Sequence, residues 1–254
     1  MNTTPPPSTA QIALRHVNKI YPGSPPLHVL KDVSVTIHKG EFVAVVGPSG
    51  SGKTTMLSIM GTLDQPTSGE VWVDGVNAAE ISEVERSSLR SDVIGFVFQQ
   101  FFLLPSLTAV ENVAEGMIYQ RIPRAERRSR AFAALEKVGL SHRAGHRPGE
   151  LSGGEQQRVA IARAIAGDPH VLFADEPTGA LDQTTGHMIV DYLRGIADTG
   201  TTVIVITHDA GLAAGFDRKI SVLDGEIVRD QRRRQPGSAP SPAPARLQPL
   251  GVAR

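Results

Sequence analysis

The chain contains no cysteine among its 254 residues, which excludes a disulfide scaffold, a zinc–cysteine site, an iron–sulfur cluster and a thiol nucleophile. It also has no apolar run approaching the roughly 18 residues that a membrane-spanning helix needs. Its longest apolar stretches, residues 42–46 and 203–206, have the length of strands. Residues 1–10 are polar and proline-rich and lack the apolar core of a secretory signal, so we expect a cytoplasmic chain.

Charge is balanced overall but uneven along the chain. Lysine and arginine number 26, and so do aspartate and glutamate. Residues 229–254 hold six arginines and one aspartate, so this segment carries +5 and the remaining body −5. A body of that sign is a poor binder of nucleic acid, because affinity there comes largely from neutralised phosphates. We expect the basic segment to be a solvated tail, with contact to an anionic membrane surface as the alternative.

Proline is concentrated at the two ends of the sequence. At that density it holds neither a helix nor a sheet ladder. The composition therefore predicts a disordered N-terminus over residues 1–10 and a disordered Pro/Arg-rich tail over residues 231–254. The folded unit is expected to span residues 11–230.

Strand-like patterns recur through the folded unit. Residues 12–16 and 33–38 alternate as half-buried strands do, and residues 42–46 are apolar throughout, as in a strand buried on both faces. Further strands are predicted at residues 71–73, 93–98, 171–174, 203–206 and 220–223.

Helical patterns lie between these strands. Helices are predicted at residues 54–61 and 155–166, with a helical insertion at about 105–150. Within that insertion Thr108 and Glu111 are predicted to form a capping box. Phe132, Leu135 and Val138 are expected to share one helical face. Strands alternating with helices predict an α/β fold with a parallel sheet covered on both sides.

A glycine-rich loop follows the apolar strand 42–46. Residues 47–54 read Gly-Pro-Ser-Gly-Ser-Gly-Lys-Thr, which matches G-x-x-x-x-G-K-[ST] between a predicted strand and a predicted helix. In such a loop the backbone N–H groups cradle phosphates at a helix N-terminus. We expect Lys53 to reach the β- and γ-phosphates and the Thr54 hydroxyl to bind Mg²⁺.

Two carboxylates end the predicted strand at 171–174. Ligands bind at this edge of a parallel sheet, so Asp175 is expected to hold the Mg²⁺ shell. Glu176, one residue further on, can face the attacking water and is the candidate general base. Together with the phosphate loop, this pair predicts a nucleoside triphosphatase.

A third motif lies at residues 151–158, which read Leu-Ser-Gly-Gly-Glu-Gln-Gln-Arg. Ser152 can cap a helix, and the two glycines let the backbone approach a ligand. The string resembles the signature motif of ATP-binding cassette (ABC) proteins, in which it precedes the acidic strand end, as it does here.

This resemblance covers nearly the whole folded unit. Gln99 matches the Q-loop glutamine, which in the family links Mg²⁺ and the attacking water to the transmembrane partner. Asp182 falls in a D-loop-like segment, and His208 matches the switch histidine that contacts the γ-phosphate. Tyr21 lies where the family places an aromatic ring stacked on adenine.

The resemblance implies a P-loop NTPase (RecA-like) parallel sheet core with an antiparallel β subdomain and an inserted α-helical subdomain. It implies ATP and Mg²⁺ as cofactors, a catalytic set of Glu176, His208 and Gln99, and metal ligands from Thr54, Gln99 and Asp175. The nucleotide-binding residues that it implies are Tyr21, Gly47, Pro48, Ser49, Gly50, Ser51, Gly52, Lys53, Thr54, Thr55, Ser152, Gly153, Gly154 and Asp182.

In the family each ATP site is completed by two chains, so the resemblance implies an ATP-dependent head-to-tail dimer of this chain. Residues 63–69, 95–99, 103–105 and 176–182 resemble the MacB/LolD/FtsE branch. That branch implies an ATPase subunit that powers export, lipoprotein release or mechanotransmission through a separate FtsX/MacB-like permease. The chain would then be peripheral, on the cytoplasmic face of the membrane. A soluble ABC ATPase not coupled to transport is the alternative.

The apolar segment 101–105 directly follows the Q-loop. It has two interpretations, which are both retained: packing of the helical insertion, or the wall of a groove for a short helix of a membrane subunit.

Overall fold

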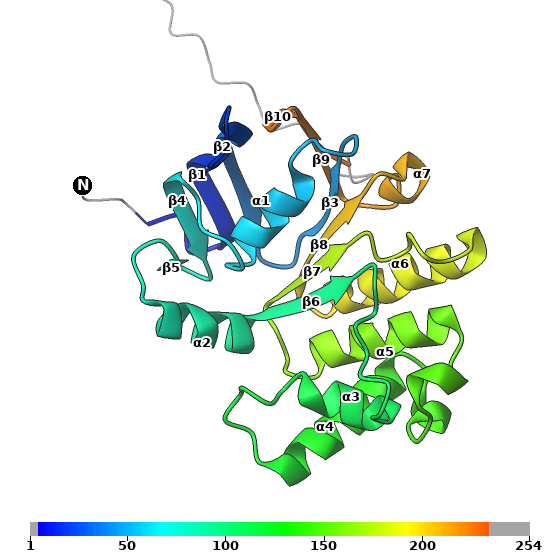
Figure 1. The fold of residues 1–254 in the computed structure, drawn as a ribbon. Coiled ribbons are helices and arrows are strands. Elements are labelled where there is room, and N and C mark those ends of the chain that lie inside the picture. The colour runs from blue at the N-terminus through cyan, green and yellow to red at the C-terminus, as the bar shows by residue number, and fades with distance from the viewer. Residues whose placement is uncertain (1–4, 234–254) are drawn as a thin grey trace, which may run out of the picture.

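The computed structural model describes residues 5–233, which form a central sheet, a second sheet and a group of helices (Figure 1). The central sheet has the strand order β10-β9-β3-β8-β7-β6. Its strands are β3 (Phe42–Val46), β6 (Ile94–Phe98), β7 (Val171–Asp175), β8 (Thr202–Thr207), β9 (Arg218–Leu223) and β10 (Glu226–Arg232). Every neighbouring pair is parallel except β9 and β10, which pair antiparallel at one edge.

The second sheet is antiparallel, with the order β2-β1-β4-β5. Its strands are β1 (Ala10–Tyr21), β2 (Leu27–His38), β4 (Ser68–Val73) and β5 (Val76–Asn77). β1 and β2 are each longer than the predicted strands at residues 12–16 and 33–38. The apolar alternation does not cover the full strands, because His16 and Asp32 each have a φ of 50° and the pairing of β1 with β2 contains register shifts.

Helices flank the central sheet. α1 (Lys53–Met60) follows β3, and α2 (Glu83–Val93) precedes β6. The helical insertion contains α3 (Ala109–Glu115), α4 (Arg124–Lys137) and the short 3₁₀ turns η1 (Ser141–Arg143) and η2 (Pro148–Glu150), and α5 (Gly153–Ile165) follows it. α6 (Gln183–Asp198) and α7 (Ala210–Ala213) complete the set. The predicted α/β fold, with its antiparallel β subdomain and helical insertion, is confirmed.

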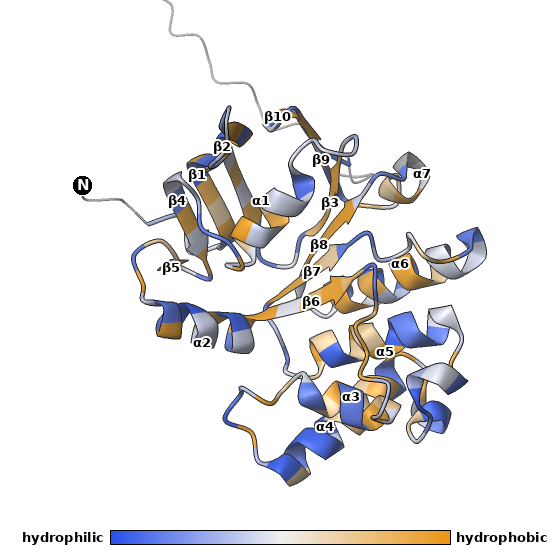
Figure 2. Cartoon of the chain, viewed as in Figure 1, coloured by the Kyte–Doolittle hydropathy of each residue, from blue (hydrophilic) through white to orange (hydrophobic). Residues whose placement is uncertain are grey.

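Two hydrophobic cores lie on opposite faces of the central sheet. Val43 and Val45 of β3 belong to a core with α1 and the antiparallel sheet, whereas Phe42 and Ala44 belong to a core with α3 to α6. Because both faces are covered, the central strands β3, β7 and β8 are mainly apolar, as Figure 2 shows. The sheet therefore serves as a rigid base whose C-terminal strand ends carry loops.

The structure corrects three details. Phe132 does not share the buried face of α4: it is 49% exposed, and that face carries Ala131, Ala134 and Leu135. The folded unit does not end at residue 230, because β10 continues to Arg232 by pairing with β9. It also begins at Ala10 rather than residue 11.

The predicted disorder of the tail falls mainly on residues 234–254, which lie outside the described residues. The predicted disorder of residues 1–10 is wrong for Ala10, which is buried in β1, and the backbone N–H of Lys39 donates to the carbonyl of Thr9. Residues 1–4 lie outside the described part. Within residues 5–233, no helix is long and apolar enough to cross a membrane.

Candidate functional site

The glycine-rich loop joins β3 to α1 at the C-terminal edge of the central sheet (Figure 1). Gly52 occupies the N-cap position of α1 with a φ of 97°, a region that residues with a side chain avoid. A Cβ at Gly52 would also lie 2.8 Å from the carbonyl oxygen of Val29. α1 has no side-chain cap, so its first backbone N–H groups are left for a ligand, and the helix dipole favours an anionic one.

A cavity of about 900 Å³ opens above this loop. Segments that are distant in sequence converge on it: the end of β1, the start of β2, the glycine-rich loop, and the residues that follow β6, β7 and β8. Its lining consists of Tyr21, Leu27, Val29, Pro48, Ser49, Gly50, Gly52, Lys53, Thr54, Thr55, Gln99, Glu176 and His208. This is the sheet edge at which α/β folds bind their ligands.

Lys53 places a positive charge at the floor of this cavity. It is 7% exposed, and its Nζ donates a hydrogen bond to the carbonyl oxygen of Pro48 at 2.7 Å. A buried ammonium group beside free backbone N–H groups makes a strongly anion-attracting surface.

Asp175 ends β7 beside Thr54 and Lys53. Burial and the neighbouring charge of Glu176 raise the pKa of Asp175, and the Thr54 hydrogen bond and the Lys53 charge oppose this only in part. The Oδ1 atom of Asp175 is buried without a hydrogen-bond partner. An unpaired buried carboxylate oxygen next to a hydroxyl fits a hard cation, and the Gln99 amide adds a third oxygen donor at the cavity. The predicted set of Thr54, Gln99 and Asp175 is therefore chemically suited to Mg²⁺.

Glu176 and His208 are paired at the cavity wall. The Nδ1 of His208 and the Oε1 of Glu176 are 2.8 Å apart. Glu176 has a φ of 46°, a left-handed conformation that costs about 1–3 kcal/mol for a residue with a side chain. Its backbone N–H donates to the carbonyl of Ile206 at 3.0 Å, which fixes it to β8. The chain thus bends sharply after Asp175, so that the two carboxylates serve different partners.

The remaining predicted residues do not line this cavity. Ser152, Gly153, Gly154 and Asp182 line a separate depression of about 530 Å³. Ser152 caps α5, and its hydroxyl and backbone N–H both donate to Glu155, at 2.9 and 2.8 Å. Gly47 and Ser51 belong to the glycine-rich loop but do not line the cavity, and Ser51 is buried.

Several residues that support the site could not be predicted from the sequence, because the residues that they contact are distant along the chain. Arg163 of α5 donates to the carbonyl oxygens of Phe102 and Phe101, at 2.6 and 2.8 Å, and so holds the segment after Gln99. Gln157 of α5 donates to the carbonyl oxygen of Pro177 at 2.8 Å, next to Glu176. Burial lowers the pKa of Arg163.

The ABC transporter family matches residues 30–179 of this sequence. The chain belongs to that family. A solved dimeric ATP-binding cassette in a post-hydrolysis state, bound to ADP and Pi, superposes with a TM-score of 0.79 at 45% sequence identity. That match covers 88% of this chain and 99% of the cassette. The fold is thus that of an ABC ATPase cassette, as the resemblance implied.

Curated relatives point to one branch of this ABC family. A pyoverdine export ATP-binding/permease protein, PvdT, of Pseudomonas fluorescens is 47% identical over 96% of this chain, which covers 37% of that protein. A macrolide export ATP-binding/permease protein, MacB 1/2, of Paracoccus denitrificans is 47% identical over 91% of this chain, which covers 35% of that protein. The chain therefore spans about a third of the length of these relatives, and its assignment to a MacB-like branch is confirmed.

Proposed function

We propose that this ABC cassette hydrolyses ATP between two copies of itself and thereby drives an export permease. One observation carries the proposal: the predicted nucleotide-binding residues are divided between two separate cavities of one chain. The larger cavity holds the phosphate loop, Glu176 and His208, and the smaller one holds the signature motif and Asp182. A second copy facing head to tail would supply to each cavity what it lacks.

The residues around the larger cavity support definite roles. The N–H groups of the loop and the Lys53 ammonium bind the phosphates, and the Tyr21 ring stacks on the base. Glu176 accepts a proton from the attacking water, while His208, hydrogen-bonded to it at 2.8 Å, holds the carboxylate toward the γ-phosphate. Ser152 and the backbone of Gly153 and Gly154 contact the same phosphate from the partner copy.

Thr54, Asp175 and Gln99 would hold Mg²⁺. When bound, the ion neutralises negative charge on the β- and γ-phosphates. The unpaired Oδ1 of Asp175 is the feature of this chain that supports its place in the set.

The transport partner is inferred from the relatives, whose names join an export ATP-binding part to a permease. We infer that this cassette works with a membrane-spanning permease of the MacB or FtsX type, on the cytoplasmic face of the membrane. A soluble ATPase without a permease is the second candidate, and recovery of a membrane protein by crosslinking in cells separates the two.

The Glu176→Gln variant tests the shared site. It removes the proton acceptor but keeps the size and polarity of the side chain, so ATP should bind and turnover should fall by about 10²-fold or more. The trapped ATP should hold two chains together, and size-exclusion chromatography with ATP would then show a dimer.

Glu80→Gln is the matched control, because Glu80 is exposed and does not line either cavity. It should behave as the unaltered chain in both assays. Normal turnover of Glu176→Gln, or an ATP-bound monomer, would contradict the proposal.

A further inference from the structure

Tyr21, at the end of β1, reaches the larger cavity but is anchored outside it. Its ring lines the cavity and the residue is 37% exposed. Its hydroxyl donates to the Oδ2 of Asp64 at 2.8 Å and also hydrogen-bonds with the Thr55 side chain. Asp64 itself does not line the cavity, so it acts on the contents of the cavity only through Tyr21.

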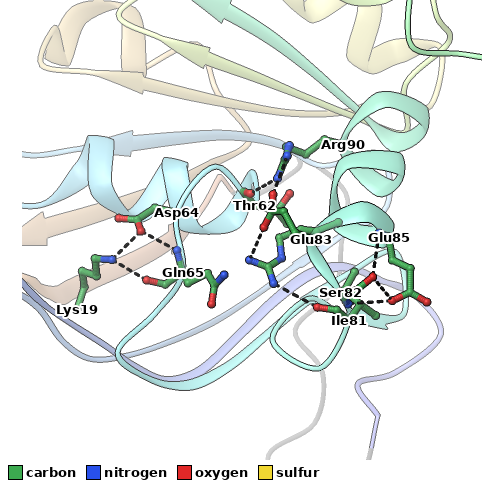
Figure 3. A network of polar contacts seen from close by, with 10 residues as sticks. Lys19, Thr62, Asp64, Gln65, Ile81, Ser82, Glu83, Glu85 and Arg90 are labelled. Atoms are coloured by element: carbon green, nitrogen blue, oxygen red, sulfur yellow. Dashed lines mark hydrogen bonds and ion pairs between the residues drawn. The ribbon is translucent and has the colours of Figure 1, made fainter.

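Asp64 also makes polar contacts with Lys19 and Gln65, which Figure 3 shows. Its Oδ1 accepts from the Nζ of Lys19 at 2.6 Å and from the backbone N–H of Gln65 at 2.7 Å, and Lys19 also donates to the carbonyl of Gln65 at 2.7 Å. Burial alone would raise the pKa of Asp64, but these hydrogen bonds and that from Tyr21 outweigh it and lower the pKa. The carboxylate is thus ionised and held from several sides.

Lys19 also covers one face of the tyrosine. Its Nζ lies 4.7 Å from the centroid of the Tyr21 ring, within the range of a cation–π contact, and its side chain is only 12% exposed. A planar base can therefore stack only on the opposite face of this ring.

The loop that carries Asp64 is fixed in turn by α2 (Figure 3). Arg90 donates to the carbonyl of Thr62 at 2.6 Å and pairs with Glu83 at 3.2 Å. Glu83 also pairs with Arg86, and a capping box between Ser82 and Glu85 begins the helix. The loop that anchors Tyr21 is consequently tied to α2 by these contacts and is not held by Tyr21 alone.

We propose that Asp64 and Lys19 are positioning residues that orient the Tyr21 ring for stacking on the nucleobase, and so set how much the base contributes to affinity. This inference rests on the proposed function, since it takes the cavity to bind ATP through its phosphates and its base. It predicts that loss of the anchor weakens recognition of the base while leaving phosphate binding in place.

The test compares two probes, ATP and inorganic triphosphate, by isothermal titration calorimetry with Mg²⁺. Asp64→Ala should weaken ATP binding about five- to tenfold, or about 1–1.4 kcal/mol, because an unanchored ring stacks less well on the base. The same variant should change triphosphate binding less than about twofold, because the phosphate loop is untouched. Tyr21→Phe, which keeps the ring and removes only the hydroxyl, should also weaken ATP binding more than triphosphate binding.

The double variant Tyr21→Phe with Asp64→Ala should bind ATP no more weakly than Asp64→Ala alone, because both substitutions remove the same contact. Asp198→Ala, an exposed carboxylate at the end of α6, is the control and should affect neither probe. Melting temperatures of all variants report any general loss of stability.

Two outcomes overturn the inference. If Asp64→Ala weakens ATP and triphosphate equally, Asp64 is only structural. If Tyr21→Ala changes the ratio of the two affinities but Asp64→Ala and Tyr21→Phe do not, the ring needs no anchor. Failure of the proposed function differs from both, because the unaltered chain would then bind neither probe.

Discussion

At the scale of single residues, the larger cavity and the smaller depression, which are the two halves of the proposed ATP site, depend on different side chains. Lys53 is buried under the phosphate loop and supplies the positive charge of the larger cavity. Ser152 lies at the smaller depression, where its side chain caps α5. Substitution of Lys53 should therefore impair ATP binding by a single chain, whereas substitution of Ser152 should have an effect only when two chains form a dimer.

Lys53→Ala and Ser152→Arg should therefore behave differently. The first should weaken ATP binding by at least about tenfold and abolish hydrolysis, because the phosphates lose their main counter-charge. The second should leave binding to the monomer nearly unchanged and block ATP-dependent dimerisation by steric bulk. Calorimetry measures the binding, and light scattering measures the dimer. An equal loss of ATP affinity in both variants would contradict the division of the site.

At Asp175 the stability of the fold and the proposed function favour different side chains. The pKa of Asp175 is raised in the folded chain, mainly by burial. Because the pKa is raised, the contribution of this group to folding is fully present below its unfolded pKa of about 3.9 and is lost as the pH rises through the higher folded pKa. At neutral pH the ionised carboxylate therefore opposes folding.

Asp175→Asn should accordingly raise the melting temperature at pH 7 in the absence of Mg²⁺ and nucleotide, while abolishing hydrolysis. The difference in melting temperature from the unaltered chain should shrink as the pH is lowered toward 4, where Asp175 takes up a proton. Scanning calorimetry across this pH range checks the prediction. A lower melting temperature for the variant at pH 7 would show that the carboxylate is stabilised by its neighbours.

At the scale of elements, α5 connects the signature motif to the segment after Gln99. Ser152 caps its first turn and Arg163 holds the carbonyls of Phe101 and Phe102. In that segment Leu103 packs against a hydrophobic core, whereas Phe102 is 62% and Leu104 49% exposed. The packing interpretation of residues 101–105 thus holds for Leu103, whereas a contact of Phe102 and Leu104 with a membrane subunit stays a prediction.

Phe102→Asn should therefore weaken co-purification with a permease several-fold and leave the melting temperature nearly unchanged. Asparagine tolerates the left-handed φ of 47° at this position, so the backbone should not be strained. Val84→Asn is the control, because Val84 is 77% exposed on α2, away from the proposed contact. Loss of the permease only in step with loss of stability would favour core packing.

The elements predicted best from the sequence were those with unambiguous patterns. β3 and β7 were placed to within one residue because both faces are buried, and the Thr108–Glu111 capping box begins α3 as predicted. α2 escaped prediction because its only buried residues are Arg86 and Val93. α6 has a regular buried face, Gly186, Ile189, Leu193 and Ala197, and could have been predicted from it.

For the site, the motifs located the residues but not their supports. The loop, the strand-end carboxylates and His208 were each recognisable from local sequence. Asp64 and Arg163 could not be assigned, because their contacts with Tyr21 and with residues 101 and 102 join segments separated by 43 to 62 positions. Such contacts depend on tertiary packing, which a single sequence does not reveal.

At the scale of the whole molecule, the described fold ends at the antiparallel edge strand β10. Gln231 and Arg232 still pair with β9, and Arg232 also forms an ion pair with Glu41 at 2.7 Å. Residues beyond this point are rich in proline and contribute little apolar sequence.

Removal of residues 235–254 should therefore leave the melting temperature and the ATPase rate nearly unchanged, because β10 and its ion pair are retained. Thermal unfolding and a steady-state ATPase assay check this. A decrease of several degrees would show that the segment packs on the body of the cassette.

The separation of the two cores has a consequence for breathing motions. The phosphate-loop helix is packed through Met56 and Leu57 into one core, and the signature helix through Val159 and Ile161 into the other. The helix at each cavity is thus packed in its own hydrophobic core, and the central sheet lies between the two cores. Amide hydrogen exchange should accordingly rise around α1 after Val45→Ala and around α5 after Val205→Ala. One core could then unfold locally while the other stays folded.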